Sequence, residues 1–140
     1  MRIGTILLAV ALAGCANSAK AEHPAKCLDL LTDSRVTVSG QLTLQLFAGA
    51  PNYESIVNGD AEERTLILEL PTRMCANDAG FIEPSESFDR VHVSASEPAI
   101  YDVLASAVGR NVTISGEAFG SQTGHHHAPL VMLVDEVSVR

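Results

Sequence analysis

The sequence predicts an all-β domain with one short helix, in which five strands form a small Greek-key barrel of the OB type. Five segments are predicted to be strands, and a helical segment separates the third from the fourth. Residues 35–47 and 88–94 alternate apolar and polar residues, as half-buried strands do, whereas the fifth segment departs from alternation at its start. The first strand is long and contains Gly40, which indicates a bend. A bent first strand can pair with two neighbours and close a small barrel. The alternative is an open five-stranded sheet with the helix on one face.

The predicted elements follow one another in the order β-β-β-α-β-β. Pro71 is expected to end the second strand, because proline has no N–H to donate to a ladder. Pro98 opens the helical segment, apolar residues recur after it at helical spacing, and Gly109 is expected to end it. The expected strands are residues 35–47, 64–70, 88–94, 111–119 and 130–139.

Length and charge limit the class of protein. The 140 residues are enough for one domain with its own core. The formal net charge is −8, and no cluster of lysine and arginine is present. Nucleic-acid binding requires such a cluster to neutralise phosphates, so we expect no nucleic-acid partner.

The N-terminus indicates export. Arg2 precedes an apolar run that is too short to span a bilayer, which is typical of a signal peptide. Leu-Ala-Gly-Cys at residues 12–15 resembles the lipobox of bacterial lipoproteins, which implies cleavage before Cys15 and a lipid on its sulfur. The alternative is an ordinary signal peptide that contains a cysteine. We therefore predict a lipoprotein signal peptide at residues 1–14, a lipidated cysteine and tether at 15–26, and the barrel domain at 27–140.

The predicted compartment is the bacterial cell envelope. Ala16, rather than Asp, follows Cys15, which favours a membrane anchor in the outer membrane, facing the periplasm. Two cysteines remain in the domain, Cys27 and Cys75. In an oxidising compartment they are expected to form a disulfide, and the alternative is two buried free thiols.

Two polar loops are the most distinctive stretches of the chain. Residues 49–63 lie between the first and second strands, and residues 120–129 lie between the fourth and fifth. In an OB fold these two loops flank the usual binding face. The candidate binding surface consists of Asn52, Tyr53, Glu54, Asp60, Thr123, His125, His126 and His127.

The loop sequences resemble a known family. Pro-Asn-Tyr-Glu-Ser at residues 51–55 and Thr-Gly-His-His-His at 123–127 are similar to the signature of a bacterial secreted family, the domain of unknown function 4431. The resemblance covers roughly residues 35–139 and implies an exported domain, with no activity or site. Ala128 stands where the family usually has threonine.

The three consecutive histidines suggest two interpretations. Alternate residues of an extended segment share a face, so His125 and His127 could bind one Zn or Cu ion while His126 points away. A third ligand would then come from Asp60, Glu54 or His92. The spacing is not one of the strong metal patterns. In the other interpretation the histidines form a structural turn, and no cofactor is bound.

The sequence contains no convincing catalytic constellation, so we expect a protein that is not an enzyme. An acid-rich loop is usually a solvated loop, and no Gly-x-Ser-x-Gly motif is present. The function we expect is a lipid-anchored periplasmic binding module of the inhibitor or immunity type, with a periplasmic protein or cell-wall partner. The alternative is a metal-binding envelope protein that uses His125 and His127, and a hydrolase ranks last.

Overall fold

The computed structural model describes residues 27–140. The predicted signal peptide, the lipidated Cys15 and the tether lie outside the described residues. The described elements are β1 (Leu28–Asp29), β2 (Arg35–Ala48), the 3-10 helix η1 (Ile56–Asn58), β3 (Glu62–Met74), β4 (Ala76–Asn77), β5 (Phe88–Ala95), α1 (Pro98–Ser106), β6 (Asn111–Gly120) and β7 (Leu130–Val139). The prediction of a mostly β domain with five main strands and one short helix is confirmed.

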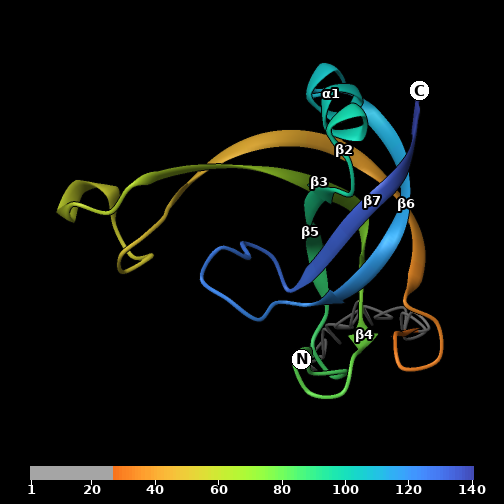
Figure 1. Ribbon diagram of the computed structural model, residues 1–140. Helices are drawn as coiled ribbons and strands as arrows, with labels where there is room; N and C mark the ends of the chain where they lie inside the picture. Colours follow the sequence, from red (N-terminus) through yellow and green to blue (C-terminus); the bar gives the residue numbers. More distant parts are fainter. Residues whose placement is uncertain (1–26) are drawn as a thin grey trace, which may run out of the picture.

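The five main strands pair in a closed ring, in the order β2-β3-β5-β7-β6 with β6 returning to β2 (Figure 1). β5 and β7 are parallel, and the other pairs of the ring are antiparallel. The short strands β1 and β4, which the sequence did not predict, form a separate parallel pair.

Gly40 marks the change of partner along β2, as predicted. Residues 35–41 of β2 pair with β6, and residues 41–48 pair with β3. A Cβ on Gly40 would lie 2.2 Å from the carbonyl oxygen of Glu69. Only glycine therefore allows β2 to approach β3 this closely where it bends.

The prediction that Pro71 ends the second strand was wrong, because β3 continues to Met74. The paired residues of β2 and β3 end at Gln41 and Glu69, whereas β3 pairs once more with β5 at Met74 and Phe88. Pro71 thus ends the pairing with one neighbour without ending the strand.

The inner face of the ring holds the apolar core, as alternation predicts. α1 adds Leu104 to this core, and Ala107, which caps the C-terminus of the helix, adds a second side chain; both have 0% exposure. The fully buried side chains that line the interior from the strands include Leu42, Leu68, Val91, Ile114, Leu130, Met132 and Val134.

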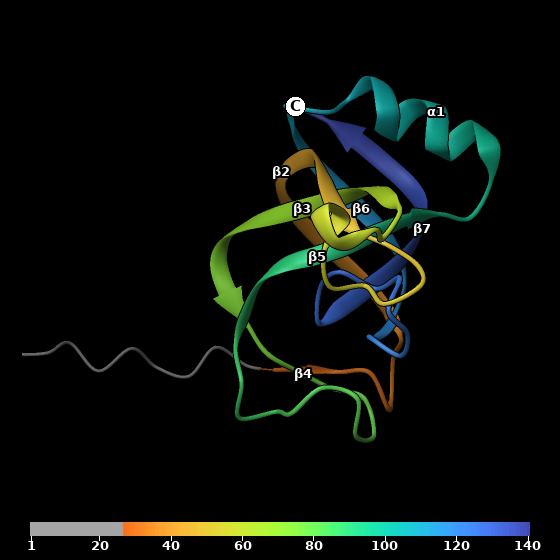
Figure 2. The same cartoon turned by 90° about the vertical axis from the view of Figure 1, so that its left-hand side faces the viewer.

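The β2–β3 hairpin projects from the ring, and the loop between β6 and β7 folds back on the same side (Figure 1). In both views α1 lies on one side of this hairpin and the β6–β7 loop on the other (Figures 1 and 2). Ile67, His92 and Val131 are neighbours across β3, β5 and β7 and point outward, yet all three are buried. The outer face of these strands is therefore covered.

A disulfide joins Cys27 to Cys75, as predicted, with an S–S distance of 1.98 Å. It lies beside the β1–β4 pair, where the backbone N–H of Leu28 donates to the carbonyl of Cys75 at 2.9 Å. Within residues 27–140, no helix is long and apolar enough to cross a bilayer.

Candidate functional site

The two predicted loops meet through Tyr53 and His125. The Tyr53 hydroxyl lies 2.8 Å from Nε2 of His125, and the two rings pack edge to face with centroids 4.9 Å apart. Gly124 lies against the tyrosine ring, and a Cβ on it would come within 2.7 Å of that ring. The Gly-His pair of one loop is thus shaped for the tyrosine of the other.

Tyr53 is held in an uncommon backbone conformation. Its φ of 60° lies in the left-handed region, which is unfavourable for a bulky residue and persists only where the surroundings fix it. Its N–H donates to the carbonyl of Gly49 at 2.9 Å, and its hydroxyl contacts His125. The contacts at both ends of the residue hold the strained backbone in place.

Glu63 joins both of the alternate histidines to the hairpin. One carboxylate oxygen lies 3.0 Å from Nδ1 of His125, and the other lies 3.5 Å from Nε2 of His127. Glu63 is at the start of β3, directly opposite Phe47 of β2. The network therefore runs from the tyrosine of the first loop, through His125, to the strand at the base of that loop.

His127 packs inward, against Phe47 and His92. Its ring stacks on Phe47 with centroids 4.1 Å apart and planes 2° from parallel. Its side chain is 9% exposed, and its backbone N–H donates to Nδ1 of His92 at 3.2 Å. Within residues 27–140, its Nε2 is the only buried side-chain nitrogen or oxygen without a hydrogen-bond partner.

Two imidazoles act as hydrogen-bond acceptors for the backbone of the β6–β7 loop. His92 accepts from the N–H of His127, and Nδ1 of His126 accepts from the N–H of Gln122 at 2.9 Å. Burial, and then the nearby His126 and His127, lower the pKa of His92 from 6.5 to about 4. Burial, followed by its histidine neighbours, also lowers the pKa of His126. Both rings are therefore neutral at pH 7, as an accepting Nδ1 requires.

Asp60 organises the first loop from within. Its carboxylate accepts the backbone N–H groups of Asn52, Glu54 and Ser55 at 2.8–2.9 Å, together with the Asn52 side-chain amide at 3.1 Å. The residue is 6% exposed. These backbone hydrogen bonds, that of Ser55 first, lower the pKa of the Asp60 carboxyl. Asp60 thus acts as a structural anion of the loop.

The structure brings together most of the predicted surface. Tyr53 and His125 touch, whereas Asn52 and Asp60 stabilise the first loop, and Glu54 is exposed at its edge. Thr123 is also exposed, and its carbonyl accepts the His126 N–H at 3.0 Å. The sequence analysis assigned no linking role to Glu63, although the pairing of two alternating strands places it opposite Phe47.

The alternative of a Zn or Cu ion between His125 and His127 has no geometric support in the described residues. Within residues 27–140, no group of three or more histidine, cysteine or acidic side chains could hold a metal ion. Of the three proposed third ligands, Asp60 accepts loop N–H groups and Glu54 is exposed, whereas His92 lies beside His127 but uses its Nδ1 to accept the His127 backbone N–H. Glu63 is the group that lies between the two rings.

The order of groups in the network is carboxylate, imidazole and hydroxyl, an order that also occurs in proton relays. Here the hydroxyl is the phenol of Tyr53, in place of the serine hydroxyl of such a relay. Glu63 and Tyr53, the two ends of this network, belong to the β2–β3 hairpin, whereas His125, at its centre, belongs to the β6–β7 loop. The geometry thus supports a clamp between two loops.

A family comparison agrees with the loop sequences. The model of a family described as "Domain of unknown function (DUF4431)" matches residues 90–138, from β5 to β7, and includes the Thr-Gly-His-His-His string. Pro-Asn-Tyr-Glu-Ser lies outside the matched part. Ala128, within it, is buried at 6% exposure. A comparison with curated proteins returned no match. Over residues 90–138, the chain is therefore similar to the DUF4431 family.

Proposed function

We propose that this protein is an OB-type binding module of the bacterial cell envelope, anchored by a lipid on Cys15, which holds a protein partner at the tip of its two loops. The strand order of the ring, the parallel pair β5–β7 and the position of α1 between β5 and β6 support the OB assignment. In that fold, the β2–β3 and β6–β7 loops are the two that flank the binding face.

The observation that carries the proposal is the clamp between the two loops. Tyr53, Glu63 and His125 join segments that are more than 60 residues apart in the chain. A preorganised surface loses less conformational entropy when it binds, so rigid loops favour affinity. Val57 lies in η1, within the loop that contains Tyr53, and its side chain is 95% exposed.

The partner is expected to bind the tip of the loops. OB folds commonly bind their ligands on the outer face between these loops. Here the β6–β7 loop already covers that face, so Ile67, His92 and Val131 are inaccessible. What stays exposed is the ends of the loops, including Glu54, Val57 and His125.

The composition of the tip favours a protein partner of the kind that an inhibitor or immunity protein recognises. The β2–β3 hairpin exposes Val57 together with the acidic residues Glu54 and Glu62, so it offers an apolar side chain among acidic ones. Acidic rims accelerate association with basic surfaces. A role in binding, rather than catalysis, also agrees with the phenol at the end of the Glu63–His125 series.

The test is affinity capture from bacterial envelope extract with the lipidated, full-length protein. We expect one partner at a stoichiometric level, and we expect Val57→Asp to reduce its capture by about tenfold or more, because a buried charge at an interface centre is costly. Val108→Asp is the matched control, since Val108 is an exposed valine just after α1.

Two results would overturn the proposal. The first is the absence of a stoichiometric partner with the unmodified protein. The second is a partner that is captured equally by the unmodified protein and by Val57→Asp. Equal losses in Val57→Asp and Val108→Asp would indicate a general surface effect and would also contradict binding at the tip.

A further inference from the structure

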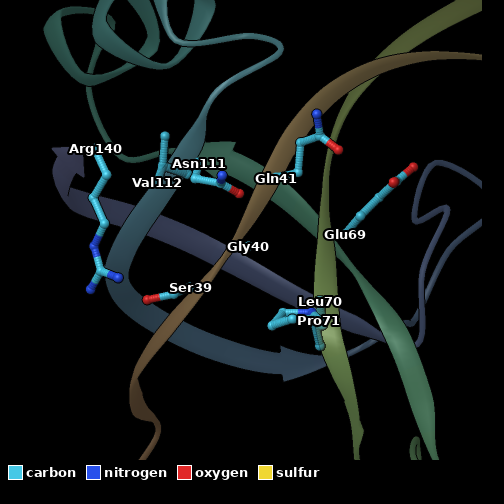
Figure 3. A pocket seen from close by; sticks show the side chains of 9 residues that line it. All are labelled: Ser39, Gly40, Gln41, Glu69, Leu70, Pro71, Asn111, Val112 and Arg140. Atoms are coloured by element: carbon cyan, nitrogen blue, oxygen red, sulfur yellow. The ribbon is translucent and has the colours of Figure 1, made fainter.

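A second feature lies away from the loops, where β2 and β3 separate. Figure 3 shows the two strands close together at Gln41 and Glu69 and apart beyond them, with Leu70 and Pro71 beside the opening. A cavity of about 560 Å³ lies at this point, lined by Ser39, Gly40, Gln41, Glu69, Leu70, Pro71, Asn111, Val112 and Arg140.

The direction of the backbone groups of β2 follows from its register. The Ala118 N–H donates to the carbonyl of Ser34, and the Leu42 N–H donates to the carbonyl of Arg110. The backbone N–H and carbonyl groups of the even-numbered residues of β2 therefore point toward β6. In an antiparallel ladder these groups alternate in direction. The N–H and carbonyl groups of Thr37 and Ser39 therefore point away from β6.

Nothing in the described chain continues the ladder on that side. Toward the C-terminal end of β2, the backbone groups of odd-numbered residues point toward β3 instead. The same register continues just beyond the strand, where the Gly49 N–H donates to the carbonyl of Ala61 at 2.7 Å. Continuing this register would place Pro71 opposite Ser39 and Arg73 opposite Thr37. Proline has no N–H to donate, and β3 turns away at this residue. β2 thus has an open edge over Thr37–Ser39.

Cavities and charges lie at both ends of this edge. A second cavity of about 360 Å³ adjoins Arg35, Val36 and Thr37 and extends to Cys27 and Asp29. Figure 3 shows the guanidinium of Arg140 on the Ser39 side of the first cavity, and the part of the chain that the structure describes offers this group no carboxylate partner.

The opposite end of the edge is negative. Asp29 and Asp33 lie at the second cavity, whereas Arg35, which also borders it, is neutralised by Asp135 at 2.6 Å. The first cavity holds the Arg140 guanidinium together with the Glu69 carboxylate, whereas the second holds two aspartates, so the guanidinium without a carboxylate partner lies at the Ser39 end of this edge in the described chain. Such a pattern favours a ligand with a carboxylate near Arg140 and a basic group near the two aspartates.

We propose that this open edge of β2 binds an extended peptide segment of a partner protein, which adds a strand beside Thr37–Ser39. Main-chain hydrogen bonds supply the binding energy in this mode, and the cavities at each end receive side chains. The charges orient the peptide, with its acidic side chain at Arg140 and its basic side chain at Asp29 and Asp33. This site is distinct from the loop tip and does not depend on the function proposed for it.

The probe is a library of random peptides displayed on phage, selected on the full chain purified in detergent. We expect enriched peptides to carry an acidic and a basic residue separated by an extended, uncharged stretch. Ser39→Pro should weaken such a peptide by about tenfold or more, because it removes one N–H donor and leaves a peptide carbonyl unpaired. It leaves the β6 ladder intact, since this N–H points away from β6.

Controls separate the edge from the side chain and from the loop tip. Ser39→Ala removes the hydroxyl, which contacts Thr113 at 2.7 Å, and should keep binding. Val57→Asp should keep it too, so failure at the tip and failure at this edge are separate results. If Ser39→Pro unfolds the domain, hydrogen exchange on the unmodified protein decides, because the Thr37 and Ser39 amides should become protected when peptide binds.

Three outcomes would overturn the proposal. One is that no peptide is enriched over a control surface. Another is that enriched peptides bind Ser39→Pro as well as the unmodified protein, or leave the two amides unprotected. The third is that the unmodified protein dimerises through this edge and Ser39→Pro is monomeric, which would make a second copy the occupant.

Discussion

The two faces of β3, β5 and β7 are buried in different ways. The inner face packs Leu68, Val91 and Leu130 against each other in the apolar core. The outer face, one residue along each strand, presents Ile67, His92 and Val131 to the β6–β7 loop. The inner face is therefore closed by the ring itself, and the outer face is closed by a loop that histidines hold in place.

This difference predicts different sensitivities. Apolar packing does not depend on protonation, whereas the outer cover requires neutral imidazoles at His92 and His126 to accept backbone N–H groups. Acid should therefore weaken the outer cover while the inner core is still intact.

The largest effect is expected from the disulfide, which constrains the end of the core near β1 and β4. Replacing both Cys27 and Cys75 by alanine opens a cross-link across 48 residues of sequence. The chain-entropy relation gives a loss of about 4 kcal/mol in the free energy of unfolding. Urea denaturation of both proteins measures this. A loss below about 1 kcal/mol would contradict a dominant entropic role for the cross-link.

Leu68→Ala and Ile67→Ala form a matched pair, because these adjacent residues have 0% exposure on opposite faces. Each should cost about 3 kcal/mol, as large-to-small changes in packed sites do. Leu68→Ala should destabilise the whole domain and leave the loops clamped in the folded state. Ile67→Ala should also increase hydrogen exchange at the His127 amide. Equal exchange at His127 in both variants would show that the two faces are not separate units.

Acid should cost about 2 kcal/mol through His92, whose pKa falls from 6.5 to about 4 on folding. Between these values the unfolded chain binds a proton that the folded chain does not, so stability present above pH 6.5 is lost as the pH falls toward 4. One pKa unit corresponds to about 1.4 kcal/mol, and residual solvent contact reduces the effect.

Urea titrations between pH 7 and pH 4 measure this loss in the unmodified protein and in His92→Gln. Glutamine can still accept a hydrogen bond but does not titrate, so the slope with pH should become smaller. His125→Gln serves as the control, because this imidazole is exposed. The same slope in the unmodified protein and His92→Gln would remove His92 as the source of acid sensitivity.

The strands, the helix, the bend at Gly40 and the disulfide could be predicted because each has a local cause. Alternation marks half-buried strands, and the predicted export signal would place Cys27 and Cys75 in an oxidising compartment. The clamp could not be predicted, because it depends on how two distant loops fold back over one face.

The sequence nevertheless contained a signal for the covered outer face. Leu66-Ile67-Leu68 is a run of three apolar residues and Leu130-Val131-Met132-Leu133-Val134 is a run of five, and both break the alternation of their strands. Such runs are typical of strands that are buried on both sides. With the ring closed on the inside, they required a cover on the outside, and the β6–β7 loop is the segment that supplies it.

The smallest and most local effect is expected at Asp60, inside the first loop. Asp60→Asn keeps the shape of the side chain but replaces one accepting oxygen by an amide, so two of the four loop N–H groups lose their partner. Hydrogen exchange at Glu54 and Ser55 should accelerate, with little change in the urea midpoint.

Because the pKa of Asp60 is lowered in the folded protein, the contribution of its carboxylate to stability depends on pH. Its contribution is complete above the ordinary value of 3.8 and is lost as the pH falls through the lower folded value. Asp60→Asn should therefore differ from the unmodified protein at pH 7, and the two should converge in strong acid. Slow exchange at Glu54 and Ser55 in Asp60→Asn at pH 7 would show that the clamp between Tyr53 and His125 orders the loop without the internal carboxylate.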